Sequence, residues 1–199
     1  MRRSAVPSIA ETRALKNNET MDHQQVIDFW FAEIKPAQWW GADADLDHVI
    51  VERFGALHAR AVRCELYKWR VHPLGRLAEV IVLDQFSRNI YRGTAQAFAA
   101  DPTALALAQE AVATNAAATL EPRQRAFLYM PYMHSESREI HEIAVRLFSE
   151  YGLEGSLDSE LKHKAIIDRF GRYPHRNSIL GRISSEEESE FLKKRRPSF

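Results

Sequence analysis

Residues 74–93 read LGRLAEVIVLDQFSRNIYRG, a stretch that combines the densest apolar run of the chain with a cluster of polar side chains. Its apolar residues cover the whole circumference of a helix: Leu77, Ala78, Val80, Ile81, Val82, Leu83 and Phe86. A helix that is apolar on every side belongs in a protein core. We therefore expect partial burial of the polar residues that it carries, which are Asp84, Gln85, Arg88 and Asn89.

Four-residue spacing predicts that the polar side chains of this segment form a stripe. Asp84 and Arg88 lie one helical turn apart, and Gln85 and Asn89 form a second such pair on the neighbouring face. An unpaired charge in a core costs several kcal/mol, so Asp84 requires a cation and Arg88 requires an anion. The stripe is therefore either a structural polar network or the floor of a site.

The composition excludes several classes of protein. The 199 residues suit one domain, and the 27 basic side chains balance the 27 acidic ones, which gives no general attraction to nucleic acid or to a membrane. Cys64 is the single cysteine, so an internal disulfide is excluded and a reducing compartment is expected. No stretch is apolar enough to span a bilayer. We expect a cytoplasmic protein with neither a membrane nor a nucleic-acid partner.

The remaining sequence predicts an all-α fold of about eight helices in antiparallel pairs. Residues 1–20 contain few large apolar side chains and are expected to form a disordered tail, which leaves residues 21–199 as a single helical domain. Helix starts are expected at Asp22, at Asp43 or Asp45, and at Asp101, where proline follows an acidic N-cap.

Two further polar clusters follow the central segment. Pro131 is expected to kink or break a helix near Phe127, and His134, Ser135 and Glu136 follow this point. The third cluster, RFGRYPHRNSILGR over residues 169–182, follows a helix that should end at Gly171. Together with Arg88 and Arg92 its arginines outnumber the nearby carboxylates, which we take to be Asp84, Glu136 and Asp168. If the clusters converge, this surplus predicts an anion-binding pocket; the alternative is that each carboxylate pairs with one arginine to lock helices together.

These three clusters resemble the motifs of a bacterial family known as domain of unknown function nine-two-four. The matching segments are LDQFSRNIYRG at 83–93, FLYMPYMHSE at 127–136 and RFGRYPHRN at 169–177, with DFWF and WW near the start of the chain. The resemblance covers Val26 to Leu192 and implies an all-helical fold similar to the tetratricopeptide superfamily, but it implies no activity. Where the family usually has a glutamine after the second motif, this chain has His141.

The residues that match the motifs are the candidates for a site. The ligand-binding candidates are Asp84, Gln85, Arg88, Asn89, Ser135, Arg172, Arg176 and Asn177. The candidates for acid–base catalysis are His134, Glu136 and His175. Their guanidinium and imidazole groups favour a domain that binds a small anionic ligand or a peptide carboxylate.

Two other functions stay open. One is an enzyme in which His134 or His175 acts with Glu136 as acid or base on a phosphate or carboxylate ester. The other is an interaction module whose motifs are structural. No H-E-x-x-H spacing occurs, so a metal site would have to combine histidines from separate helices. The sequence contains neither a P-loop nor a G-x-G-x-x-G motif for binding a nucleotide. We therefore expect no metal and no cofactor.

Overall fold

The computed structural model describes residues 21–194, and every regular element in this range is helical. This confirms the predicted all-α class. The expected tail, residues 1–20, lies outside the described residues. The α-helices are α2 (His23–Asp28), α3 (Ala44–Val62), α4 (Pro73–Ile81), α5 (Ser87–Ile90), α6 (Asp101–Ala113), α7 (Pro122–Met133), α8 (Arg138–Phe148), α9 (Glu154–Phe170) and α10 (Glu186–Lys194).

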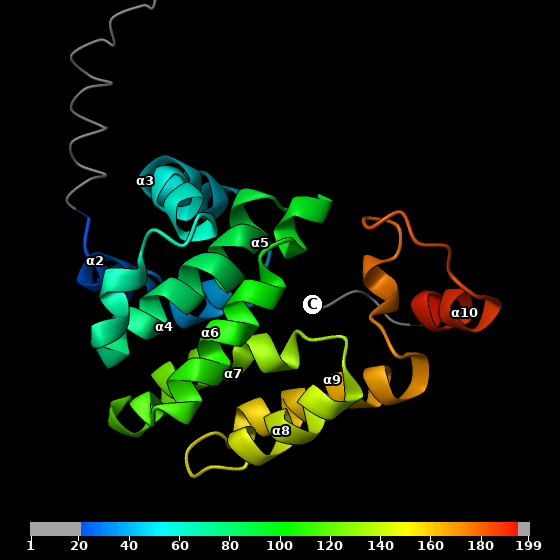
Figure 1. The fold of residues 1–199 in the computed structure, drawn as a ribbon. Helices are drawn as coiled ribbons and strands as arrows, with labels where there is room; N and C mark the ends of the chain where they lie inside the picture. Colours follow the sequence, from blue (N-terminus) through cyan, green and yellow to red (C-terminus); the bar gives the residue numbers. More distant parts are fainter. Residues whose placement is uncertain (1–20, 195–199) are drawn as a thin grey trace, which may run out of the picture.

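In the first half of the described chain the helices pack mainly on non-consecutive partners, such as α2 on α4 and α3 on α5, and from α6 to α9 each helix packs on the next. Helix α4 contacts α2, α6 and α7, and it therefore lies at the centre of the packing. The series continues with α7 on α8 and α8 on α9, while α10 lies to one side and is reached through the loop after α9 (Figure 1). None of the described helices has the length and apolar character that crossing a bilayer requires.

The main core forms around α4, as the apolar run predicts. Leu77, Val80 and Ile81 are fully buried, and Phe86 packs against the rings of Trp30 and Phe54. A smaller core beside α9 consists of Ile166, Ile167 and Tyr173, against which Phe170 and Phe191 pack. Tyr173 belongs to the third polar motif, so this core fixes the position of that motif.

The central segment is not the single regular helix that was expected. A π-helical turn, Val82–Phe86, separates α4 from α5. A π turn contains an additional residue and changes the direction of the side chains that follow it, and such turns are frequent at functional sites. Asp84 and Gln85 lie in this widened turn, whereas Asn89 turns away from Gln85 to donate a hydrogen bond to Asp47 of α3, 2.7 Å away.

The predicted helix starts are partly correct. The side chains of Asp22 and Asp43 cap α2 and α3 as expected. Asp101 is not an N-cap: Ala100 occupies that position, and the Asp101 carboxylate contacts Arg88 and Arg176 instead. Pairing with buried guanidinium groups is stronger than a cap to backbone N–H groups, because both partners are charged.

Of the kink or break that Pro131 led us to expect, the break does not occur. Helix α7 continues through Pro131 to Met133 and buries every residue from Ala126 onward. Packing of this face outweighs the one backbone hydrogen bond that proline removes. The helix ends directly before His134, so the second polar motif still begins at a helix terminus.

Candidate functional site

Asp84 and His134 form the buried centre of the site. Asp84 Oδ1 lies 2.8 Å from His134 Nδ1 and 3.1 Å from an Arg88 nitrogen, and Gln85 Nε2 donates to Asp84 Oδ2 at 2.6 Å. Burial alone would raise the pKa of Asp84, but the charge of Arg88, together with His134, lowers this pKa well below its ordinary value. Asp84 is therefore an ionised carboxylate that can only accept hydrogen bonds.

The ionised carboxylate determines the tautomer of His134. Since Asp84 only accepts, Nδ1 of His134 carries the proton and Nε2 presents a lone pair. Burial and the charge of Arg88 lower the pKa of His134 despite the opposing effect of Asp84, so the ring is neutral at pH 7. Within residues 21–194 no hydrogen bond is made to Nε2, and the side chain keeps 16% of its surface exposed.

Asp101 connects the first motif to the third. Arg88 binds the Asp101 carboxylate with both terminal nitrogens, at 3.0 and 3.1 Å. Arg176 reaches the same carboxylate with one nitrogen at 3.4 Å, a longer and weaker contact. We call the connected set Asp84, Arg88, Asp101, His134 and Arg176 the polar network.

The guanidinium group of Arg176 packs on two aromatic rings. Its guanidinium carbon lies 4.6 Å from the ring centre of Phe98 and 4.6 Å from that of Tyr173. Its side chain is 8% exposed, and its Nε is enclosed without a hydrogen-bond partner among the described residues. Burial and the nearby charge of Arg88 lower the pKa of Arg176. Arg176 is therefore a buried cation with only one long hydrogen bond to a carboxylate.

The other catalytic candidates lie beside this network. The His175 ring packs on Tyr173, with 5.4 Å between ring centres, and burial followed by the Arg176 charge lowers its pKa to about 4. Glu136 does not pair with a histidine: it binds Arg182 with both oxygens, at 2.6 and 2.9 Å, and accepts from the backbone of Tyr173. The hypothesis that Glu136 assists His134 is not supported by these contacts, because Asp84 occupies that position.

A second layer of hydrogen bonds supports the segment that follows α7. Tyr173 donates its hydroxyl to the carbonyl of Met133, and His141 Nε2 lies 2.9 Å from the carbonyl of Ser135. His141 Nδ1 lies 2.6 Å from Glu160, which is fully buried. Ser135 thus contributes its backbone carbonyl to these hydrogen bonds. His141 holds in place the segment after α7 that carries His134.

Three candidates have partners outside the network. Arg172 binds Glu188 of α10 with two nitrogens, and Asn177 donates to Ser184. Asn89 contacts Asp47, as described above. Glu188 also forms a capping box with Ser185 at the start of α10, because each residue accepts a hydrogen bond from the backbone N–H of the other.

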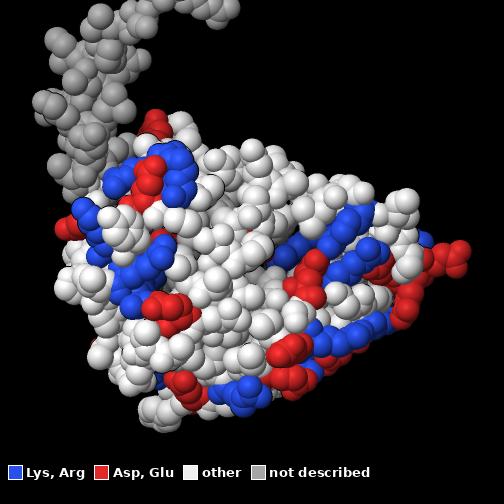
Figure 2. Space-filling model, viewed as in Figure 1, with Lys and Arg blue, Asp and Glu red and all other residues white. Residues whose placement is uncertain are grey.

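The expected surplus of positive charge is reduced by carboxylates that the motifs do not contain. Asp47, Asp101 and Glu188 pair with Arg92, Arg88 and Arg172 respectively. Figure 2 shows the same balance on the surface, where acidic and basic side chains alternate over the part formed by α9 and α10. Arg176 is the exception within the motifs, because its bond to Asp101 is long and shared.

Sequence reasoning missed Asp101, Phe98 and Tyr173. Asp101 precedes Pro102 and has the signature of a helix cap, so its local sequence gives no sign of long-range pairing. Tyr173 lies inside the third motif, but a tyrosine at this position is readily interpreted as an ordinary core residue. Phe98 ends a short 3-10 turn before α6, and only the tertiary structure reveals that its ring and that of Tyr173 pack on one guanidinium.

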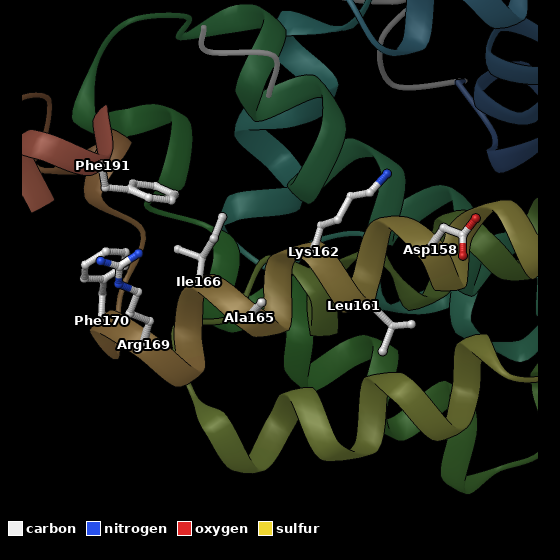
Figure 3. A pocket seen from close by; sticks show the side chains of 8 residues that line it. All are labelled: Asp158, Leu161, Lys162, Ala165, Ile166, Arg169, Phe170 and Phe191. Atoms are coloured by element: carbon white, nitrogen blue, oxygen red, sulfur yellow. The ribbon is translucent and has the colours of Figure 1, made fainter. Parts of the chain in front are cut away.

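Two surface grooves lie outside the polar network. A groove of about 710 Å³ follows one face of α9, from Leu161 and Ala165 to Phe170 at the end of this helix, where it meets Phe191 of α10 (Figure 3). A second, of about 480 Å³, lies between His23, His72 and Leu120. Neither contains a residue of the polar network. In the described part of the chain, no three His, Cys, Asp or Glu side chains are arranged to hold a metal ion.

Comparison with known proteins gives a family and a similar structure. The model of the family described as "Bacterial protein of unknown function (DUF924)" matches residues 26–196. The solved structure of the protein of unknown function ATU0120 from Agrobacterium tumefaciens is 35% identical, with a TM-score of 0.83. The similarity covers 87% of this chain and 97% of that one. No curated protein matches the chain.

Proposed function

Because this chain belongs to the bacterial family DUF924, whose description names no activity, we propose its function from the geometry of the polar network. We propose that the network binds a small anionic ligand, such as a phosphate or the carboxylate of a small molecule or peptide. Arg176 is the main anion-binding group, His175 lies near enough to it for the Arg176 charge to lower the pKa of His175, and His134 is linked to it through Asp84, Arg88 and Asp101. Arg88 has a structural role, since its charge is already matched by Asp84 and Asp101.

The observation that carries this proposal is the incomplete pairing of Arg176. Arg88 takes both oxygens of Asp101, so Arg176 is left with a single contact of 3.4 Å. A buried charge that lacks good partners costs several kcal/mol, and native proteins seldom keep one without a reason. A bound anion would supply the missing acceptors.

The aromatic rings around Arg176 determine how an anion can approach. Phe98 and Tyr173 each place a ring centre 4.6 Å from the guanidinium carbon, and we infer that an acceptor comes from the edge of the guanidinium that the rings leave open. This edge is the direction in which guanidinium groups bind phosphate or carboxylate with two parallel hydrogen bonds. The rings also hold the side chain in place before a ligand arrives, which lowers the entropy cost of binding.

The test is the effect of anions on the melting temperature. Potassium phosphate and potassium acetate are compared with potassium chloride at matched ionic strength, because a ligand that binds only the folded state stabilises it. Arg176→Gln should abolish the rise that phosphate or acetate produces. The matched control is Arg172→Gln, which removes an arginine paired with Glu188 and should leave the rise intact. An equal rise in the wild type and in Arg176→Gln would contradict the proposal.

The Asp84–His134 contact favours acid–base catalysis as a second candidate function. A neutral imidazole with Nδ1 bound to a carboxylate and Nε2 open has the arrangement of a general base. It replaces the pairing with Glu136 that the sequence suggested. Hydrolysis of p-nitrophenyl phosphate and p-nitrophenyl acetate by the wild type and by His134→Gln tests it. Turnover that does not depend on His134 would remove this candidate.

A further inference from the structure

The polar network contains a hydrogen-bond donor group, Arg176, and a hydrogen-bond acceptor, Nε2 of His134. Arg176 can only donate, since a guanidinium has five N–H groups and no acceptor. His134 presents the opposite chemistry at Nε2, because Asp84 holds the proton on Nδ1 at a distance of 2.8 Å. A ligand that meets both groups must accept hydrogen bonds and also donate one.

The contacts of the network bring these two groups into one neighbourhood. Arg88 touches Asp84, which holds His134, and it also binds Asp101, which Arg176 contacts. His175 lies close enough to Arg176 for the charge of that guanidinium to lower the pKa of His175. The three sequence motifs are therefore joined by one continuous series of contacts between Arg176 and His134.

We propose that this site selects an oxyanion that keeps a hydroxyl proton, with hydrogenphosphate as the representative ligand, over an oxyanion that can only accept, such as sulfate. The oxygens of the ligand accept from Arg176, and its hydroxyl donates to Nε2 of His134. The inference rests on the proposed anion-binding function and adds the class of anion to it.

Sulfate differs from hydrogenphosphate mainly in this one proton, since both are tetrahedral dianions near pH 8. At His134 a sulfate oxygen would place its lone pair against the lone pair of Nε2. The lost hydrogen bond and the repulsion in a partly buried site correspond to at least about tenfold in affinity.

His134 cannot easily adapt to sulfate. Moving its proton to Nε2 would set the Nδ1 lone pair against the ionised carboxylate of Asp84. Adding a second proton is opposed by burial and by Arg88, although Asp84 and Asp101 favour it. The neighbouring rings of His163 and His175 have pKa values lowered to about 4, so they are also neutral at pH 8. The acceptor at Nε2 is therefore fixed by the groups around it.

The same chemistry separates inorganic phosphate from phosphate monoesters. A monoester loses its last proton with a pKa of about 6, so at pH 8 it has no hydroxyl to donate. Hydrogenphosphate keeps its proton at this pH. Glycerol 2-phosphate should therefore behave like sulfate at pH 8, and a free phosphate should be preferred over a phosphate group on a larger molecule.

The experiment measures the binding of three anions to the full-length protein by titration calorimetry at pH 8. Potassium phosphate, potassium sulfate and glycerol 2-phosphate are compared at one ionic strength. The wild type should bind phosphate at least about tenfold more tightly than either of the others. His134→Gln should bring the phosphate-to-sulfate ratio close to one, because the glutamine amide can donate to sulfate. The control His163→Gln should keep the ratio of the wild type, since His163 packs on the Tyr173 ring outside the network.

The outcomes separate this inference from the proposal on which it rests. Equal affinity of the wild type for phosphate and sulfate would overturn the selectivity and leave anion binding in place. Absence of binding by any of the three anions would overturn both. If His134→Gln weakened all three equally, His134 would have a structural role only and the inference would fail. Should that variant not fold, the ratio measured with the wild type still decides.

Discussion

Asp84 Oδ1 lies 2.8 Å from Nδ1 of His134, which is 50 positions further along the chain. Asp84 sits in the π turn Val82–Phe86, and His134 directly follows the last residue of α7. Both are therefore placed where a regular α-helix is interrupted or ends. Helix α4 packs against α7, which brings the two side chains together.

The first prediction concerns the stability of the buried charges. Asp84→Ala and Arg88→Ala should each lower the free energy of unfolding by about 3–5 kcal/mol, because each leaves buried opposite charge without its partner. Urea unfolding followed by circular dichroism measures this. The control is Lys193→Ala, which removes an exposed pair with Glu190 and should change stability by less than about 0.5 kcal/mol. A small effect of Asp84→Ala would mean that its burial is not maintained in solution.

The second prediction ranks the two arginines that share Asp101. Arg88 binds this carboxylate with two nitrogens, whereas Arg176 makes one contact of 3.4 Å. A double-mutant cycle between Asp101→Asn and Arg88→Gln should therefore give a coupling energy well above that between Asp101→Asn and Arg176→Gln. Equal couplings would show that Arg176 is as well paired as Arg88, which would remove the main support for anion binding.

The third prediction is the tautomer of His134. Nitrogen-15 spectra at pH 8 should show a protonated Nδ1 and an unprotonated Nε2, because the Asp84 carboxylate can only accept. In Asp84→Asn this preference should weaken, since an amide can also donate. A wild-type ring protonated at Nε2 would contradict the arrangement from which the selectivity for hydrogenphosphate follows.

The fourth prediction is a loss of stability on acidification. Burial lowers the pKa of His163 and of His175 to about 4, while in the unfolded chain a histidine titrates near 6.5. Between these values the unfolded state binds more protons, so stability falls as the pH decreases from about 6.5 to about 4. Each histidine contributes a slope of up to about 1.4 kcal/mol per pH unit.

This slope is measured as the change in unfolding free energy between pH 7 and pH 5. His175→Gln and His163→Gln should each flatten it, because glutamine does not titrate. His48 is a suitable control, since its side chain is largely exposed. If His175→Gln and His48→Gln gave the same slope as the wild type, His175 would not be neutral and buried in the folded protein.

The sequence by itself determined the fold class and the burial of the central segment. An apolar run that covers a whole helix circumference leaves no surface for water, so residues 74–93 had to lie in a core. The same pattern required partners for Asp84 and Arg88, and both are found as predicted. The three motifs also identified most of the residues that converge.

Only the tertiary structure decided which charges meet. Asp101 is the first residue of α6. Its pairing with Arg88 and Arg176 depends on how the start of α6 is placed relative to these two arginines. The π turn likewise could not be predicted, because it widens a helix whose sequence fits a regular one. Most of the arginines that the sequence suggested were in surplus are paired with carboxylates from other helices. Spacing along a chain fixes neighbours within one helix, whereas pairing between helices depends on their packing, and that packing left Arg176 with a single long contact.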